Sequence, residues 1–201
     1  MRLPVLLQST NKQENTMMTE ISLNVLDVAE NSIRAKADFI QISVTVDSVS
    51  DRMTIVIADN GCGMTAEQIA QVEDPFFTTR TTRSVGLGVP FFKYAAEITG
   101  GEFRIKSEPG KGTEVTAVFV LSHIDRMPLG DMNSTIQTLI TFNTDIDFLY
   151  TYTIDEKSFS LSTSLFREIL GEIPFDSPEV TAYIKDYLRE NTEEVNNGKY
   201  I

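Results

Sequence analysis

The sequence predicts an α+β fold in which helices alternate with pairs of antiparallel strands. Three pairs of apolar or alternating segments are each separated by a short turn, which is the pattern of β-hairpins. Between these pairs, apolar residues recur at helical spacing. Because the chain has 201 residues, of which 41% are hydrophobic, it is long enough to bury a substantial core.

The first 121 residues provide two of the hairpins. Ile21, Val25 and Val28 recur at helical spacing in the first helix. Thr65, with Gln68 three residues later, forms a capping pattern at the start of a short helix. The predicted elements are a helix at 18–36, strands at 39–47 and 53–58, helices at 65–72 and 88–99, and strands at 102–107 and 114–121.

The last two-fifths of the chain predict a small α/β appendage of acidic character. Residues 121–201 contain 14 of the 29 acidic residues and 6 of the 17 basic ones. The predicted elements are a helix at 130–142, a hairpin of strands at 146–154 and 157–161, and helices at 163–171 and 178–194. We therefore expect a flexible N-terminus (1–17), a main domain (18–122) and an acidic C-terminal extension (123–201).

Composition narrows the classes of function and the compartment. The formal net charge is −12, which disfavours binding to nucleic acid and to anionic membrane surfaces. Cys62 is the only cysteine, so no internal disulfide forms and a reducing compartment fits. The apolar run at residues 3–7 is too short for a signal-peptide core or a membrane span. We therefore expect a cytoplasmic protein.

A stripe of polar side chains runs along the first predicted helix. Its members are Asn24, Asp27, Asn31 and Arg34, and their spacing of three, four and three residues places them on one helical face. A solvated surface would explain such a stripe, but the residue types suit a metal-bound phosphate. An amide at Asn31 can bind Mg²⁺, a carboxylate at Asp27 can orient or deprotonate water, and a guanidinium at Arg34 can hold phosphate.

A second polar group follows the strand at 53–58. Asp59, at the strand end, can accept a hydrogen bond from an exocyclic amine. Gly61 and Gly63 let a flat base approach the backbone. In isolation this motif would indicate no more than a turn at the end of a strand.

A third segment, residues 74–88, combines hydroxyl groups, arginines and glycines. Arg80 and Arg83 can reach phosphates, although ordinary loop solvation would also explain them. Gly86 and Gly88 lie at a helix start, where free backbone N–H groups suit an anion. The sequence has no Gly-x4-Gly-Lys-Ser/Thr pattern, which excludes a P-loop. In this order, the three segments predict an ATP site of another kind.

Residues 20–121 resemble the ATP-binding domain shared by DNA gyrase, heat-shock-90 chaperones, sensor histidine kinases and mismatch-repair ATPases, the GHKL superfamily. The histidine-kinase-type catalytic domain is the most similar. The matching motifs are the N box at 24–34, glycine boxes at 59–63, 86–88 and 110–113, and the phenylalanine box at 74–79. The resemblance implies the Bergerat fold, a two-layer α/β sandwich with helices on one face of a mixed sheet and ATP between helix and lid.

The resemblance also implies roles for individual residues, with ATP and Mg²⁺ as cofactors. Asn31 would bind Mg²⁺, Arg34 would contact phosphate, and Asp59 would read adenine with water-mediated support from Thr113. The hydrolytic members place a general-base Glu where this chain has Asp27, and Glu30 is the second candidate for the base. The expected ATP contacts are Asn24, Asn31, Arg34, Asp59, Gly61, Gly63, Met64, Phe76, Thr79, Arg80, Arg83, Gly86, Leu87, Gly88 and Thr113.

Two classes of function follow from the resemblance. The first is an ATPase or a protein kinase acting on a separate protein, as the small anti-sigma kinases of this superfamily do. The second is a non-catalytic module whose loop 74–87 orders on ATP and changes a surface for a partner. The segment before the N box is too short for a dimerisation and phospho-acceptor domain, so we expect a partner in trans. His123 resembles part of a phospho-acceptor box, but a strand-end histidine before a linker is the simpler interpretation.

Overall fold

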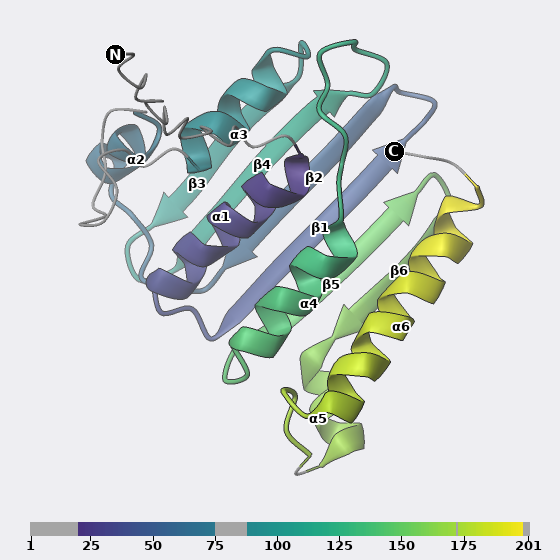
Figure 1. Cartoon of the computed structure of the whole chain (residues 1–201). Coiled ribbons are helices and arrows are strands. Elements are labelled where there is room, and N and C mark those ends of the chain that lie inside the picture. Colours follow the sequence, from purple (N-terminus) through teal and green to yellow (C-terminus); the bar gives the residue numbers. More distant parts are fainter. Residues whose placement is uncertain (1–19, 75–87, 172, 199–201) are drawn as a thin grey trace, which may run out of the picture.

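The computed structural model describes residues 20–74, 88–171 and 173–198 (Figure 1). Within these residues, six strands form one mixed sheet in the order β3-β4-β2-β1-β5-β6. The strands are β1 (Phe39–Asp47), β2 (Arg52–Asp59), β3 (Glu102–Glu108), β4 (Gly112–Val120), β5 (Asp147–Ile154) and β6 (Lys157–Ser162). The helices are α1 (Ile21–Arg34), α2 (Ala66–Val72), α3 (Gly88–Glu97), α4 (Met132–Phe142), α5 (Thr163–Leu170) and α6 (Pro178–Asn196).

The helices cover one face of the sheet, as Figure 1 shows for α1, α3, α4 and α6. Strand β1 shows why: Ile40, Ile42, Val44 and Val46 are buried, whereas the residues between them are more exposed. Because successive side chains of a strand point to opposite faces, this alternation buries one face and leaves the other toward solvent. The predicted α+β class, with helices on one face of a mixed sheet, is confirmed.

The C-terminal segment continues the same sheet. Strand β5 pairs in parallel with β1, with Phe39 opposite Asp147, and β6 pairs antiparallel with β5. Strand β4 runs in the same direction as β1 and β5, because β2 is antiparallel to both β1 and β4. The chain must therefore cross over the sheet between β4 and β5, and this crossover contains α4. The predicted boundary near residue 122 falls in the connection between β4 and α4. That residues 18–122 and 123–201 are separate domains stays a prediction.

Most element boundaries lie within one to three residues of those predicted, because local side chains determine them. Thr65 and Gln68 form the predicted capping box at the start of α2. Helix α3 ends at Glu97, two residues earlier than predicted. The helix ends in a Schellman motif, in which Gly100, with φ +74°, donates its N–H to the Glu97 carbonyl at 2.9 Å and Gly101 donates its N–H to the Ala96 carbonyl at 3.2 Å. These two bonds turn the chain toward β3 instead of allowing a further helical turn.

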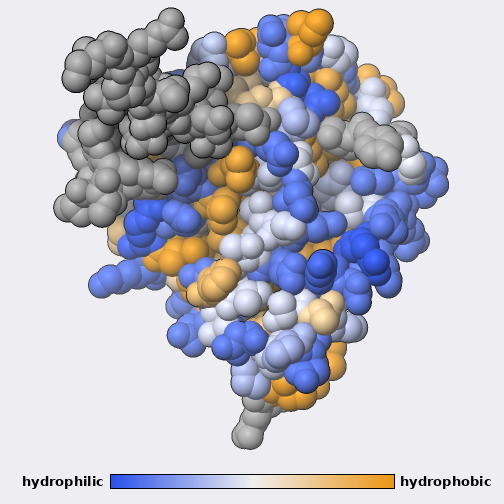
Figure 2. Space-filling view, in the orientation of Figure 1, coloured by the Kyte–Doolittle hydropathy of each residue, from blue (hydrophilic) through white to orange (hydrophobic). Residues whose placement is uncertain are grey.

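On the face of the molecule seen in Figure 2, hydrophilic side chains are interspersed with places where apolar side chains gather. One apolar group lies on and just after α5, where Leu165, Ile169 and Ile173 are all more than half exposed. Among the described helices, none is both long enough and apolar enough to cross a bilayer.

Two buried tyrosines in the C-terminal half of the core should make the stability of the protein depend on alkaline pH. Burial raises the pKa of Tyr152 to about 12, and burial also raises the pKa of Tyr150. A tyrosine with an ordinary pKa of 10.0 ionises more readily once the chain is unfolded. The free energy of unfolding should therefore hold below pH 10 and fall as the pH rises toward 12.

Urea unfolding followed by circular dichroism at a series of alkaline pH values measures this loss. Tyr152→Phe should lose less free energy of unfolding over that range than the wild type. Tyr183→Phe, which changes a side chain that is 55% exposed on α6, should lose as much as the wild type. Equal alkaline losses in all three proteins would contradict the prediction.

Candidate functional site

A cavity of about 300 Å³ lies between helix α1, the start of α3 and the strands β2, β3 and β4. Part of its wall is apolar and part is polar. The apolar side chains are Val28, Ala35, Met64, Val72, Val89, Pro90, Ile105 and Val115. The wall also contains Asn31, Ser32, Arg34, Asp59, Cys62, Gly63, Gly88 and Thr113. An apolar slot with a few fixed polar groups is the usual form of a small-molecule site.

The carboxylate of Asp59 is fixed at the end of β2. The hydroxyl of Ser32, on α1, donates to its Oδ2 at 2.6 Å, and the backbone N–H of Gly61 donates to its Oδ1 at 2.9 Å. Thr113 lies directly opposite Asp59 on β4. A carboxylate can accept about four hydrogen bonds, so these two leave capacity for a further donor from the cavity. Asp59 is thus a positioned acceptor.

The hydroxyl of Ser107 joins three parts of the cavity wall. It donates to the Gly112 carbonyl at 2.9 Å and accepts from the Met64 backbone N–H at 2.8 Å. Its third contact, with the Thr113 hydroxyl at 2.8 Å, then has Thr113 as the donor, because Ser107 has a single proton to give. This leaves the lone pairs of the Thr113 hydroxyl available as acceptors.

The first glycine turn packs closely against its neighbours. Gly63 has φ +65°, and a Cβ there would lie 2.0 Å from the Glu108 carbonyl oxygen. A Cβ on Gly61 would lie 2.8 Å from the Ala35 Cβ. The backbone is further tied by Cys62, whose N–H donates to the Ala35 carbonyl and whose carbonyl accepts from the Gly110 N–H. Only glycine fits at position 63, so the turn is held against both α1 and the last hairpin.

Two residues of the polar stripe on α1 reach the cavity. They are Asn31 and Arg34, and they contact each other: Nη1 of Arg34 donates to Oδ1 of Asn31 at 2.8 Å. Nη2 of the same guanidinium donates to Glu30 at 2.7 Å. In this conformation the Asn31 oxygen therefore faces a positive group. A cation at Asn31 requires Arg34 to turn away, toward the mouth of the cavity or the phosphates of a ligand.

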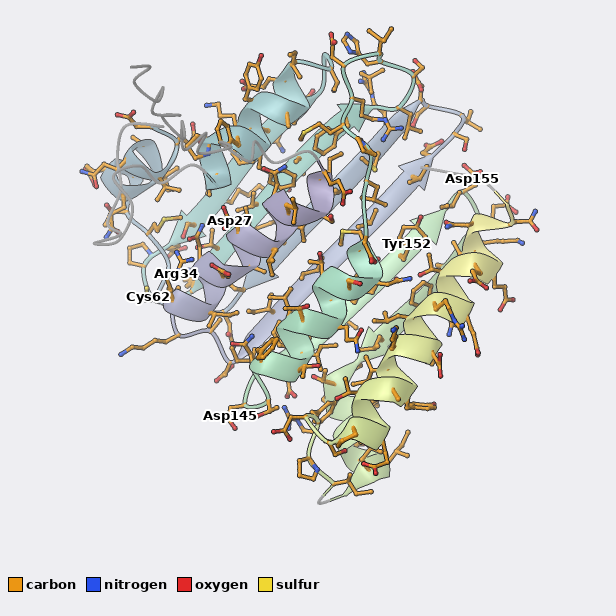
Figure 3. All side chains as sticks on the ribbon, in the orientation of Figure 1. Asp27, Arg34, Cys62, Asp145, Tyr152 and Asp155 are labelled. Atoms are coloured by element: carbon orange, nitrogen blue, oxygen red, sulfur yellow. The ribbon has the colours of Figure 1, made fainter. Side chains whose placement is uncertain are left out.

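The other three stripe or base candidates do not line the cavity. Asn24 is fully buried near the start of α1, where its Nδ2 donates to the Glu20 carbonyl at 3.4 Å. Asp27 is half-buried and packs on the helix α3, since a Cβ on Gly88 would lie 2.8 Å from its Oδ2. Glu30 is exposed and lines a different cavity, between α1 and α4. Figure 3 shows Asp27 and Arg34 on α1, with Cys62 beside its C-terminal end.

Six of the predicted ATP contacts lie outside the described residues. They are Phe76, Thr79, Arg80, Arg83, Gly86 and Leu87. Of the remaining predicted contacts, the structure brings Asn31, Arg34, Asp59, Gly63, Met64, Gly88 and Thr113 together around one cavity. Residues from α1, the β2 end, the start of α3 and β4 converge there although they are far apart in the sequence.

The comparison with known proteins agrees with this geometry. Residues 17–123 match the family described as histidine kinase-, DNA gyrase B-, and HSP90-like ATPase. The chain belongs to this ATPase family. The match covers more than half of the chain and includes every residue of the cavity wall.

Part of the chain is similar to part of several bacterial sensor proteins and kinases. The chain is 33% identical over 91 residues to Sensor protein DegM of Bacillus sp. (strain B21-2), covering 45% of this chain and 24% of that one. It is 35% identical over 97 residues to Sensor protein kinase FleS of Pseudomonas aeruginosa, covering 48% and 24%. It is 33% identical over 101 residues to Sporulation kinase E of Bacillus subtilis, covering 50% and 13%. The chain thus spans a quarter or less of each of these relatives.

Several residues of the cavity wall were absent from the sequence prediction. Val115 and Ile105 belong to the apolar part of this wall, and both could have been predicted from Thr113. Val115 is two residues further along the same strand face, and Ile105 is its partner across the hairpin. Ser32 carries no such signal, because a serine beside Asn31 reads as an ordinary helix residue until the helix is placed against β2.

Proposed function

We propose that this protein binds Mg–ATP in the cavity beside Asp59 and uses it to phosphorylate or regulate a separate protein. The observation that carries the proposal is the positioned carboxylate of Asp59, held by Ser32 and Gly61 at one end of an apolar slot. The ATPase family of the chain supports the nucleotide. The relatives with kinase names support phosphoryl transfer.

The cavity residues fit an adenine base. The exocyclic amine of adenine donates hydrogen bonds, and Asp59 offers an oxygen acceptor that is already oriented. Thr113 lies opposite Asp59 and offers a hydroxyl acceptor, directly or through water. The apolar side chains of Val28, Ile105 and Val115 suit the faces of a flat ring. The close packing at Gly63 keeps the floor of this slot rigid.

The residues at the end of α1 fit the phosphates and the magnesium ion. Asn31 supplies the amide oxygen and Arg34 supplies the guanidinium, which matches phosphate geometry. Mg²⁺ bound there would neutralise phosphate charge, the usual contribution of this ion to phosphoryl transfer. Arg34 would then exchange its contact with the Asn31 oxygen for a contact with phosphate. Asp27, one helical turn before Asn31, would orient the attacking water or hydroxyl.

The acceptor of the phosphoryl group would belong to another protein. His123 is the only histidine of the chain, and it follows β4 at the end opposite to Thr113. The strand residues between Thr113 and Val120 alone span roughly 24 Å, so His123 lies far from the cavity. The backbone N–H of Asp125 also donates to its Nδ1 at 3.2 Å, as expected for a structural turn. We further propose that the protein is cytoplasmic and that its partner is a protein. The net charge of −12 disfavours nucleic acid and anionic membrane surfaces as partners.

A non-catalytic, nucleotide-responsive module is the second candidate function. The observation that favours it is the position of Asp27, which packs against Gly88 and is not part of the cavity wall. Aspartate is also shorter than the glutamate of hydrolytic members. In this alternative, binding of nucleotide would release Arg34 from Asn31 and change the surface at the end of α1.

Substitution of the two candidate bases separates these functions. If the protein turns over ATP, Asp27→Asn should abolish turnover and keep ATP binding, because the charge matters for proton transfer and hardly for adenine recognition. Glu30→Gln is the matched control, since Glu30 is exposed and faces α4. It should keep turnover within about twofold, as expected for an exposed ion pair. Each variant is incubated with labelled ATP. Free phosphate then measures hydrolysis, protein-bound label measures phosphoryl transfer, and bound nucleotide measures ATP binding.

The opposite pattern would overturn the assignment. Turnover that survives Asp27→Asn and is lost in Glu30→Gln would place the base on the α4 side of the helix. A wild type that binds ATP without turnover and without transfer to partner proteins would favour the binding module. A wild type that does not bind ATP would contradict both candidate functions.

A further inference from the structure

A second cavity, of about 400 Å³, lies between α1 and α4 and shares Arg34 with the cavity beside Asp59. Its apolar side chains are those of Leu26 and Ile33 on α1 and of Leu139 and Phe142 on α4. Among its lining residues, Glu30 is the acidic one and Arg34 the basic one. Figure 1 shows the two helices side by side, and Figure 3 shows Arg34 at the end of α1.

The two helices run in the same direction and leave a trough between their C-terminal parts. They start together, because the backbone N–H of Ile21 donates to the Pro128 carbonyl at 3.0 Å and α4 begins soon after, at Met132. The lining residues of α1 fall within 26–34 and those of α4 within 138–142, toward the C-terminal ends of both helices. A trough between two helices is a common docking place for a third helix.

The surface of α4 has the composition of an interface. None of its residues, from Met132 to Phe142, is charged. Phe142 is 80% exposed at the edge of the trough, and Leu26 and Ile33 on the other wall are partly exposed. Surface helices normally carry charged residues on their open side, whereas the core of a protein–protein interface is depleted of them. An apolar patch that is open to water in such a setting marks a contact site.

The charges of the trough favour a basic partner. Nη2 of Arg34 donates to Oε2 of Glu30 at 2.7 Å, and Nη1 donates to Oδ1 of Asn31 at 2.8 Å. If Arg34 turns to the phosphates of ATP, the Glu30 carboxylate is left in the trough without this cation. The C-terminal ends of α1 and α4 both lie here, and the negative end of a helix dipole also favours a cation. Beyond these ends, Lys36 and Asp145 are exposed and add opposite charges.

We propose that this trough binds a basic amphipathic helix of the partner protein. The apolar stripe of that helix would cover Phe142 and pack between Leu26 and Leu139. A lysine or arginine of the same helix would pair with Glu30. The net charge of −12 would assist its approach. Docking at the trough does not depend on the proposed binding of ATP.

Arg34 links the trough to the ATPase site, and this link rests on the proposed binding of ATP. The guanidinium has two alternative sets of partners, which are Glu30 and Asn31 in the present conformation and phosphate in the proposed complex. A basic side chain of the partner at Glu30 replaces Arg34 there and favours its move to phosphate. Partner and ATP then strengthen each other's binding by the same factor, as linkage requires. Because the pair of Arg34 and Glu30 is exposed, we expect a factor of about two to five.

Two synthetic helical peptides test the trough with the full chain. They share one leucine stripe and carry either lysine or glutamate at their polar positions, and fluorescence anisotropy at physiological salt measures their binding. The lysine peptide should bind more tightly than the glutamate peptide. Phe142→Ala should weaken binding of the lysine peptide by roughly tenfold, the effect of one large apolar contact. Leu165→Ala, which removes an exposed apolar side chain from α5, should leave its binding unchanged.

Glu30→Gln separates the charge from the apolar contact. It should reduce the preference for the lysine peptide over the glutamate peptide. It should also abolish the mutual effect of the lysine peptide and Mg–ATP. That effect is measured by calorimetry of Mg–ATP with and without saturating lysine peptide, and by the peptide titration with and without Mg–ATP.

The outcomes separate the docking site from the link to ATP. Docking at the trough is overturned if neither peptide binds, if the two peptides bind equally, or if Phe142→Ala and Leu165→Ala weaken the lysine peptide equally. An affinity for ATP that the lysine peptide does not change would overturn the link through Arg34. A wild type that binds the lysine peptide at the trough but binds no ATP would support the docking site and contradict the proposed function.

Discussion

Asp59→Asn is expected to weaken ATP binding by roughly 5- to 150-fold, which corresponds to about 1–3 kcal/mol. The carboxylate serves Ser32, Gly61 and, in the proposed complex, the adenine amine. An asparagine has one acceptor oxygen, and its NH₂ group must then face at least one of these donors. The loss therefore includes a direct donor–donor conflict as well as a missing bond.

Isothermal calorimetry with Mg–ATP measures this change, and circular dichroism verifies that the variant is folded. The matched control is Asp145→Asn, which makes the same chemical change at an exposed turn between α4 and β5 that does not line the cavity. It should bind ATP like the wild type. GTP adds a test of direction, because guanine carries an acceptor where adenine carries the amine. Asp59→Asn should narrow the preference for ATP over GTP. Unchanged affinity for ATP would remove the adenine assignment.

The parts of the fold that depend on residues close together in the sequence could be predicted from the sequence. The hairpin of β1 and β2 follows from alternation across a short turn, and its predicted strand bounds agree with the structure to one residue. The capping box of Thr65 and Gln68 is equally local. The pairing of β5 with β1 could not be predicted in this way. These strands are about a hundred residues apart, and nothing in either strand alone selects the other as its neighbour.

The candidate site likewise contains residues that local sequence predicts and residues whose role depends on tertiary packing. Asp59 and Gly63 could be predicted because the end of a strand and the turn after it carry a recognisable motif, and Thr113 could be predicted from the resemblance of its hairpin turn to a glycine box. Ser32 could not, because its role depends on how α1 lies against the end of β2. Asn24 shares a helical face with Asn31. The spacing of residues shows which face of a helix they occupy, but it does not show which part of that face is buried by another segment of the chain. At the start of α1, the N–H groups of Ile21 and Ser22 are bound by residues 128 and 129, and Asn24 is buried.

Gly112→Ala is expected to lower the free energy of unfolding by about 3–5 kcal/mol. Gly112 has φ +104°, which a residue with a side chain rarely adopts. A Cβ there would lie 1.9 Å from the Asp59 carbonyl oxygen and 2.8 Å from the Asn60 Cα. Both are backbone atoms of the site, so relief requires β2 and β4 to separate at the Asp59–Thr113 pair.

The chain offers a matched control two residues away. Gly110 has φ +78° in the same hairpin turn, and a Cβ there would meet nothing within 4 Å. Gly110→Ala therefore tests the backbone conformation without the contact and should cost only about 1–2 kcal/mol. Urea unfolding followed by circular dichroism measures both variants. At temperatures where it stays folded, Gly112→Ala should also bind ATP more weakly than Gly110→Ala, because the displaced backbone carries both Asp59 and Thr113. Equal losses of the free energy of unfolding in the two variants would contradict the prediction. The close contact of Gly112 with the backbone of Asp59 and Asn60 would then not contribute to stability.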